Sequence, residues 1–295
     1  MARESGLVGS PGPAVVSGID RGRLKRALGK VRREARRPEG RVVVVHAAKG
    51  GAGTSTLAAN LAAALLAHGG PVALADLALW SADQDMLWNL TPVLRIPDVL
   101  GPEGHDLQDA LCSHRSGVRI LAGPSGPEDA ELVVPQGIPG LLEALSLRHP
   151  SVVVDTSAGF DDATLRALCA ASHILVPIPP ELPALRATQR ALAVWERLGV
   201  PLDRLRLCLW DRRGAVDAQL AGRVLGRPIA FRLPWAPQEA HEAINTGEPA
   251  SLARRNSALA RGVGAVAASL VPGALVAPGQ FAWLGRLKER FGVFA

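Results

Sequence analysis

The sequence lacks any apolar run of the roughly 18 residues that a helix needs to cross a bilayer, although 48% of its 295 residues are hydrophobic. Its first residues, MARESGLVGSPGP, also lack the apolar core of a signal peptide. We therefore expect neither a membrane-spanning nor an exported protein. The length and the apolar content instead predict a cytoplasmic protein with a sizeable buried core.

Cysteine is scarce and follows no metal-binding pattern. Cys112, Cys169 and Cys208 stand far apart without a CxxC spacing, and none of the seven histidines has the spacing of metal ligands. These absences argue against a zinc site. An odd number of cysteines in a chain that is not exported predicts reduced and mostly buried thiols. We expect core roles for His46 and His173, because both fall within apolar strands.

Lysine is also rare, since only Lys25, Lys30, Lys49 and Lys288 occur among 33 basic residues. Residues 20–37 hold nine basic and two acidic residues, whereas the rest of the chain holds 24 basic and 25 acidic ones. The net charge of +6 therefore belongs to one segment. We expect that segment to be solvated, with acidic lipid, nucleic acid or an acidic partner as alternatives. It has no interleaved aromatic residues, which argues against a specific RNA-binding box.

Short apolar runs alternate with helical patterns from Arg41 onward. We expect strands at 41–47, 71–76, 117–122, 151–156, 172–178, 204–210 and 227–232. We expect helices at 55–68, 137–148, 161–170, 181–198, 214–224, 237–246 and 257–270. Nearly continuous apolar strands that alternate with helices predict an α/β fold with a mostly parallel sheet and helices on both faces. We assign 41–272 to this domain, 1–40 to a disordered lead and basic segment, and 273–295 to a linker and an amphipathic tail.

A glycine-rich loop follows the first expected strand and runs directly into a helix. Its residues are Lys49, Gly50, Gly51, Ala52, Gly53, Thr54, Ser55 and Thr56. Glycines let the backbone turn sharply, and their N–H groups form an anion-binding nest next to the positive end of the helix. We therefore predict that these eight residues bind nucleotide phosphates and that Ser55 ligates Mg²⁺. The alternative is a glycine-rich turn without a ligand.

The loop departs from the ordinary P-loop pattern G-x-x-x-x-G-K-[ST], because Ala48 and Thr54 replace its first glycine and its lysine. It resembles K-G-G-x-G-K-[ST]-[ST], the deviant Walker A motif of the MinD/ParA family of P-loop NTPases. The resemblance implies that ATP or ADP binds with Mg²⁺ and that the protein forms a nucleotide-dependent homodimer. It also implies that Lys49 reaches the phosphates of a nucleotide bound by the partner subunit.

Four later segments carry the resemblance through residues 41–272. DLALWSADQDMLWNL at 76–90 and SVVVDTSAGFDDATLRAL at 151–168 resemble the CpaE/TadZ branch of the family. Residues 179–199 and 207–213 occupy the places of two further family segments. This branch implies a localisation factor for septum-site determination, as in actinobacterial CpaE-like proteins, or for positioning pilus or secretion machinery. The implied partner is a protein of that machinery.

Three aspartates are candidate site residues. Asp155 ends an apolar strand, where it can hold Mg²⁺ directly or through water, or can instead cap the next turn. The resemblance implies a catalytic D-x-D pair at 76–78, and here Asp76 remains while Ala78 replaces the second aspartate. Asp211 stands where the family has an asparagine that reads adenine. The alternative role of Asp211 is a salt bridge to Arg212 or Arg213.

Thr54 and Ala78 bear on hydrolysis. Thr54 lacks the ammonium group that neutralises charge on the transferred phosphoryl group, and Ala78 cannot polarise water. Lys49 and Asp76 remain as catalytic candidates, and Asp83 or Asp85 are possible replacements. We therefore expect a nucleotide-dependent localisation factor with weak or absent hydrolysis. The alternatives are an active ATPase that cycles between membrane and cytoplasm, and a ParA-like DNA-binding partition protein.

The tail at 281–295, FAWLGRLKERFGVFA, places its bulky apolar residues along one helical face and its basic residues elsewhere. Such a helix suits an anionic membrane surface. Peripheral binding at the inner face of the plasma membrane is thus an alternative location. The competing interpretation is a terminal helix that docks on the protein's own core.

Overall fold

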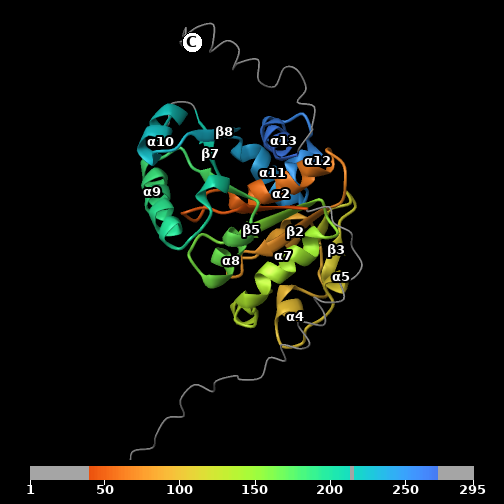
Figure 1. Cartoon of the computed structure of the whole chain (residues 1–295). Coiled ribbons are helices and arrows are strands. Elements are labelled where there is room, and N and C mark those ends of the chain that lie inside the picture. Colours follow the sequence, from red (N-terminus) through yellow and green to blue (C-terminus); the bar gives the residue numbers. More distant parts are fainter. Residues whose placement is uncertain (1–39, 213–215, 272–295) are drawn as a thin grey trace, which may run out of the picture.

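The computed structural model describes residues 40–212 and 216–271. Its centre is one eight-stranded sheet with the strand order β3-β4-β2-β5-β1-β6-β7-β8. Every neighbouring pair is parallel except β3 and β4, which are antiparallel. Helices cover both faces of the sheet (Figure 1). The predicted α/β architecture with a mostly parallel sheet is confirmed.

The strands are β1 (Arg41–Val45), β2 (Val72–Leu77), β3 (Leu111–Ser113), β4 (Arg119–Leu121), β5 (Ser151–Thr156), β6 (His173–Ile178), β7 (Leu205–Asp211) and β8 (Ile229–Pro234). The longer helices are α2 (Thr54–Leu66), α7 (Ile138–Ser146), α8 (Asp162–Ala170), α9 (Leu182–Arg197), α10 (Ala218–Leu225), α11 (Pro237–Thr246) and α13 (Ala258–Leu270). Short helical pieces are α3 (Gln84–Leu87), α4 (Ile96–Leu100), α5 (Leu107–Ala110), α6 (Pro127–Ala130), α12 (Ala250–Ala253) and the 3₁₀ turns at Pro135–Gly137 and Leu202–Arg204.

All seven strands and all seven helices expected from the sequence are present, with ends that differ by a few residues. The prediction omitted β3 and the short helices. Each of these pieces has only three to five residues, which is too short to display a helical or strand period.

The run of valines in β1 divides between two hydrophobic cores. Val42 and Val44 pack with the helices α7–α10 on one face, whereas Val43 and Val45 pack with α2 and α13 on the other. All four side chains are at most 7% exposed. A central strand that is buried on both faces therefore needs an apolar residue at every position rather than at every second one.

The buried-thiol and core-histidine predictions hold only in part. Cys208 is buried, but Cys112 is half-buried and Cys169 is exposed. His46 is fully buried, as expected, and bonds through Nδ1 to Thr156 Oγ1 at 2.9 Å. His173 is only half-buried, because it opens β6 at the rim of the sheet.

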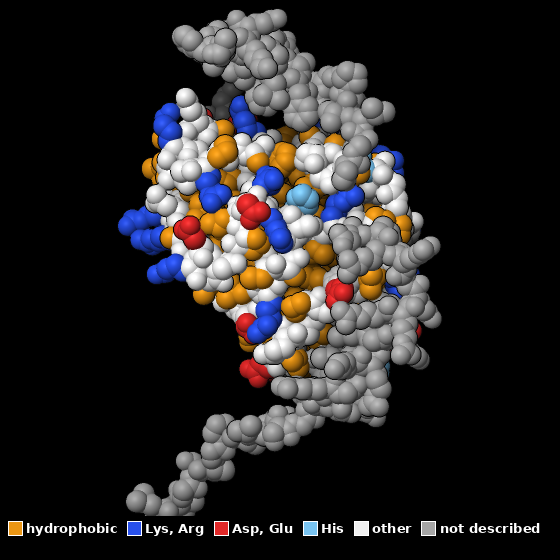
Figure 2. Space-filling model, in the orientation of Figure 1, with side chains coloured by type: hydrophobic (Ala, Val, Ile, Leu, Met, Phe, Trp, Pro, Cys, Tyr) orange, Lys and Arg blue, Asp and Glu red, His pale blue; other side chains and the backbone are white. Residues whose placement is uncertain are grey.

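The outer surface carries a basic region near one edge of the sheet. Figure 2 shows Lys and Arg side chains that project at the side where α9 and α10 lie. In α9 the exposed arginines are Arg186, Arg190 and Arg197. None of the helices in the described ranges has the length and apolarity required to traverse a bilayer. The basic segment 20–37 and the tail 281–295 lie outside the described residues.

Candidate functional site

The glycine loop lies between β1 and α2, at the carboxyl edge of the sheet. Gly51 and Gly53 have φ values of 73° and 84°, in the left-handed region that favours glycine. Gly53 is the N-cap of α2, and no side chain caps the helix. The first N–H groups of this 13-residue helix are therefore available to an anion.

A tryptophan from a distant strand supports the loop. Trp210 lies near the end of β7, is 6% exposed, and donates from Nε1 to the carbonyl oxygen of Ala52 at 2.8 Å. Its ring lies so close to Gly53 that a Cβ at that position would be 3.1 Å from an indole carbon. Gly53 is thus required both by its φ value and by the indole beside it.

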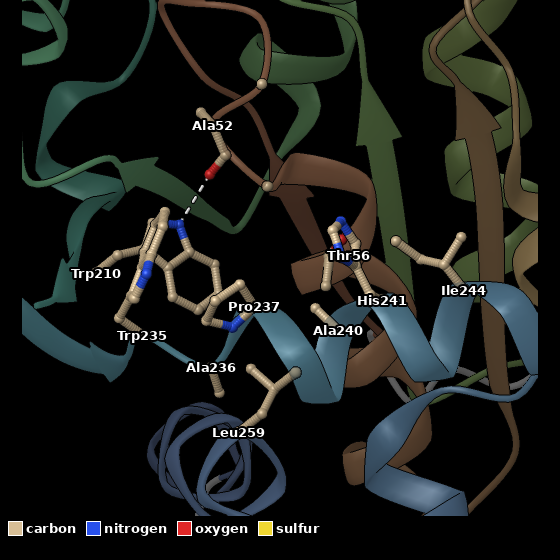
Figure 3. Close-up of a pocket in the computed structure, with 12 residues that line it drawn as sticks. Ala52, Thr56, Trp210, Trp235, Ala236, Pro237, Ala240, His241, Ile244 and Leu259 are labelled. Carbon is tan, nitrogen blue, oxygen red and sulfur yellow. Dashed lines mark hydrogen bonds between the residues drawn. The ribbon is translucent and has the colours of Figure 1, made fainter.

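A cavity of about 190 Å³ opens beside the loop. Figure 3 shows Trp210 and Trp235 side by side at one end and the α11 side chains along the other. The lining comprises Gly51, Ala52, Gly53, Thr56, Trp210, Trp235, Ala236, Pro237, Ala240, His241, Ile244 and Leu259. Two indoles, a proline and aliphatic side chains form a largely apolar surface next to the loop's N–H groups. This arrangement suits a ligand with a flat ring and a phosphate.

Two buried carboxylates lie on the other side of the start of α2. Asp76 of β2 and Asp155 of β5 are 0% exposed and are paired in register on neighbouring strands. Asp76 accepts hydrogen bonds from the backbone N–H groups of Ala78 and Gln84 at 3.1 and 2.9 Å. Asp155 Oδ2 accepts one from Gln84 Nε2 at 2.8 Å, whereas Oδ1 has no partner among the described residues.

Burial makes these carboxylates hard to ionise. Burial raises the pKa of Asp155 to about 6, with partial compensation from the side chains of Gln84 and Ser55. The pKa of Asp76 is raised well above its usual range, first by burial and then by the charge of Asp155. A hard cation would relieve both effects, and the unpartnered Oδ1 of Asp155 is the kind of oxygen that Mg²⁺ takes. The residues therefore fit Mg²⁺.

The described ranges contain no cluster of three or more His, Cys, Asp or Glu residues that could hold a metal. A site with one or two protein carboxylates is typical of Mg²⁺, which keeps several waters and takes its other ligands from a bound phosphate. A preformed zinc-type centre is thus absent from this part of the chain.

Lys49, at the start of the loop, forms an ion pair within its own chain. Its Nζ lies 2.6 Å from Oε1 of Glu181, and both side chains are 46% exposed. Glu181 is the N-cap residue of α9 and follows the strand β6. Surface pairs of this kind contribute little to stability. The contact therefore leaves Lys49 available for other partners.

Asp211 does not line the cavity, although it directly follows the lining residue Trp210. Its Oδ2 forms an ion pair with Arg232 of β8 at 2.6 Å. Among the described residues its partner is Arg232 rather than Arg212, because β7 and β8 are parallel and adjacent and place Arg232 beside Asp211. Arg213, the other arginine expected as a partner, lies outside the described residues. The role of Asp211 in base recognition stays a prediction.

Asp83 and Asp85 are the candidates to replace the aspartate that is missing at position 78, but one is exposed and the other is held in an ion pair. Ala78 is buried and has no polar group. Asp85 Oδ2 pairs with Arg95 Nη2 at 2.7 Å, and Arg95 also donates to the carbonyl oxygen of Gly123. Asp83 is exposed at the start of α3. Asp85 thus fixes the loop between β2 and α4.

Three side chains of this site were not identified from the sequence: Gln84, Trp210 and Trp235. The alternation of β7 contained a signal for Trp210, since Cys208 and Trp210 face one core and Leu207 and Leu209 face the other. No comparable signal existed for Gln84, which lies in a polar loop by composition.

No family model matches the chain. The antiactivator FleN of Pseudomonas aeruginosa is 35% identical over 144 residues, which are 48% of this chain and 51% of FleN. The septum site-determining protein MinD of Thermotoga maritima is 27% identical over 173 residues, 58% of this chain and 64% of that protein. An ATP-binding protein of Methanocaldococcus jannaschii is 28% identical over 162 residues, 54% of this chain and 61% of that protein. The chain thus spans between about half and two thirds of the length of these relatives.

Solved structures give the same result for the fold. MinD of Pyrococcus horikoshii, complexed with Mg-ADP, superimposes with a TM-score of 0.71 at 23% identity and covers 79% of this chain and 96% of its own. A ParA family ATPase of Chlorobium tepidum gives a TM-score of 0.72 at 22% identity over 77% of this chain and 98% of its own. The fold of this chain is therefore that of the MinD/ParA P-loop ATPases, and its sequence is similar to MinD and FleN.

Proposed function

We propose that this protein is a MinD/ParA-like nucleotide-binding localisation factor that hydrolyses ATP weakly or not at all. One observation carries the proposal: the uncapped start of α2 and its glycine loop lie beside a buried carboxylate oxygen, Asp155 Oδ1, that has no partner in the described part of the chain. Fixed N–H dipoles suit phosphate oxygens, and the orphan oxygen suits a cation that accompanies them.

The bound species is ATP or ADP with Mg²⁺. Residues 49–56 would contact the phosphates, with the cavity between Trp235 and α11 next to them for the rest of the nucleotide. Ser55 and Asp155 would hold Mg²⁺ directly or through water. When bound, Mg²⁺ neutralises phosphate charge and fixes the phosphate geometry. Asp211 is the proposed contact to the base.

Weak hydrolysis follows from two side chains. Thr54 opens α2 where an ammonium group would stabilise the transferred phosphoryl group, and the side chain of the buried Ala78 has no polar atom that could activate water. Removal of one electrostatic donor commonly lowers a catalytic rate by about 10²–10³-fold. Binding depends mainly on backbone N–H groups and can therefore persist when turnover is lost.

The biological role that we propose is to position cellular machinery: septum-site or pilus and secretion components, as in the CpaE/TadZ branch. Its support is similarity to proteins named septum site-determining MinD and to the antiactivator FleN. A solved MinC:MinD complex has the same fold with a TM-score of 0.68. We propose a nucleotide-dependent homodimer, with Lys49 moving from Glu181 to the partner's nucleotide. Its proposed location is the cytoplasm or the inner face of the plasma membrane.

The test is thermal stabilisation of the purified protein by Mg-ATP, Mg-ADP and Mg-GTP, with phosphate release followed in the same samples. Ten micromolar affinity at millimolar nucleotide, for example, stabilises by about 2.7 kcal/mol. We expect stabilisation by ATP and ADP without release. Gly53→Val should abolish it, and Gln108→Leu, on the remote helix α5, should leave it unchanged. Clear phosphate release would instead establish an active ATPase, and a lack of any shift would overturn nucleotide binding.

DNA binding is a second candidate function, favoured by the exposed arginines Arg186, Arg190 and Arg197 along α9. A basic helix face attracts the phosphate backbone in a salt-dependent manner. We would measure retention of duplex DNA at rising salt for the full chain and for the triple variant R186Q/R190Q/R197Q. Equal retention of both proteins would remove α9 from consideration, and a separate deletion of residues 1–38 would test the basic segment.

A further inference from the structure

A buried glutamine joins the two carboxylates to the start of α2. Gln84 is 0% exposed and begins α3. Its Nε2 donates to Asp155 Oδ2 at 2.8 Å and to the carbonyl oxygen of Ser55 at 3.1 Å. Its backbone N–H donates to Asp76 Oδ2 at 2.9 Å. One residue therefore contacts β2, β5 and α2 at the same point.

The orientation of the Gln84 amide is determined by its partners. Asp155 Oδ2 and the Ser55 carbonyl can only accept, so the amide nitrogen must face them. On the other side, Trp88 Nε1 can only donate, and it lies 3.2 Å from Gln84 Oε1. Trp88 is itself 0% exposed. The indole thus locks the amide with its donors directed at Asp155.

Gln84 performs part of what a cation would do at this edge. Two neighbouring buried carboxylates repel one another unless a positive charge or hydrogen-bond donors lie near them. Here the backbone N–H of Gln84 donates a hydrogen bond to Asp76, and its side-chain amide donates one to Asp155. Because the amide occupies Oδ2, Oδ1 is the oxygen of Asp155 that remains for a metal or its water.

We propose that Gln84 is a positioning residue that holds Asp155 and the first turn of α2 in their binding arrangement before Mg²⁺ arrives, so that nucleotide binding depends only weakly on Mg²⁺. This inference rests on the proposed nucleotide site. It adds that the metal requirement of the site is set by a neutral side chain bridging the two strands.

The experiment compares the Kd of ADP in excess Mg²⁺ with its Kd in EDTA, measured by calorimetry on the full-length protein. For the wild type, we expect the ratio of the Kd in EDTA to the Kd in Mg²⁺ to stay below about 10. In Gln84→Leu, which keeps the size and removes both donors, the ratio should rise by about 10- to 100-fold, the range that loss of a hydrogen bond to a charged group produces. Gln84→Glu should bind ADP still more weakly in EDTA, because it adds a third carboxylate. Gln108→Leu is the matched control, since the Gln108 Nε2 has no partner within the described residues.

A spectroscopic measurement checks the geometry. The indole N–H resonance of Trp88, assigned with Trp88→Phe, should shift in Gln84→Leu and stay in place in Gln108→Leu. If Gln84→Leu fails to fold, Trp88→Phe replaces it, because this variant keeps most of the packing and removes the hydrogen bond that orients the Gln84 amide. The ratio of the Kd in EDTA to the Kd in Mg²⁺ should then rise several-fold. An unchanged ratio in the folded variant, or a wild-type ratio far above 100, overturns the role of Gln84 alone. Failure of wild-type protein to bind ADP in either condition overturns the nucleotide site as well.

Discussion

The two sides of the start of α2 are built in opposite ways. On the loop side, consecutive residues supply backbone N–H groups, and Trp210 holds the loop through its hydrogen bond to Ala52. On the carboxylate side, Asp76, Gln84 and Asp155 come from three separate elements and meet only in the folded sheet. The loop side presents backbone N–H groups to an anion, whereas the carboxylate side carries groups whose ionisation is unfavourable without a cation.

The two sides of the site should therefore contribute to the stability of the folded protein with opposite signs. Glycines adopt the backbone angles of the loop without strain, and a buried indole holds the loop in place. The loop can therefore be ordered before a ligand binds at little cost in free energy. The carboxylate edge is electrostatically unfavourable when empty and improves when a cation arrives. Changes on the loop side should therefore destabilise the protein, and neutralisation of the carboxylate side should stabilise it. Four predictions test this contrast.

The largest effect is expected at Trp210. Trp210→Ala removes a buried indole and should lower the free energy of unfolding by about 3–5 kcal/mol. Trp210→Phe keeps most of the packing and loses the bond to Ala52, so it should cost only about 1–2 kcal/mol. Urea unfolding measures both. Equal losses in the two variants would mean that the hydrogen bond, and not the packing, supports the loop.

Asp155→Asn should change stability in the opposite direction. The native pKa of Asp155 is raised from 3.8 to about 6, so the folded state is penalised wherever this carboxyl is ionised. In EDTA at pH 7.5 the variant should be more stable by up to about 3 kcal/mol. The gain should shrink as the pH falls through 6 and vanish below about 4, where the carboxyl is protonated in both states. Urea unfolding of both proteins over a series of pH values measures this difference. If Asp155→Asn were less stable than wild type at pH 7.5, the carboxylate side would not be unfavourable when empty.

Two glycines of the loop provide a matched pair. Gly53→Ala places a Cβ at φ 84° and 3.1 Å from the Trp210 ring, so it should cost about 1–2 kcal/mol. At Gly50 the space around a Cβ is open and no positive φ occurs. Gly50→Ala should therefore change the free energy of unfolding by less than about 0.5 kcal/mol. Similar losses at both positions would show that the indole and the φ value are not the cause.

The smallest effect is expected at Glu181. Because its ion pair with Lys49 is half-exposed, Glu181→Gln should leave the melting temperature nearly unchanged. If Lys49 must leave Glu181 to reach a nucleotide, the variant should bind Mg-ATP slightly more tightly than wild type. Calorimetry measures the difference, with Asp162→Asn, at another exposed ion pair, as the control. Weaker binding by Glu181→Gln would mean that the pair orients Lys49 for its ligand.

The contrast also explains which parts could be predicted from the sequence. The loop could be recognised because residues 49–56 are contiguous and lie between an apolar strand and a helix. The sheet could be recognised because runs such as VVVV in β1 are long enough to identify a strand buried on both faces. Local patterns of this kind carry their own physical signal.

The remainder depends on contacts between distant positions. The pairing of Asp76 with Asp155 requires that β2 and β5 be neighbours, although the 73 residues 78–150 lie between these strands in the chain. Gln84 lies in a segment whose composition predicts a solvated loop, yet it is fully buried. The ion pair of Asp211 with Arg232 could not be predicted for the same reason, since Arg232 is close in the sheet and distant in the sequence. Strand order cannot be derived from single-strand patterns.

The two indoles that line the cavity also give the protein an optical property. Trp210 and Trp235 are two of only six tryptophans in the chain. A molecule that enters the cavity must displace water from Trp235, which is 44% exposed, and must approach the ring of Trp210. Its arrival therefore alters the emission of a third of the chromophores, and occupancy of this site can be followed by intrinsic fluorescence without any label.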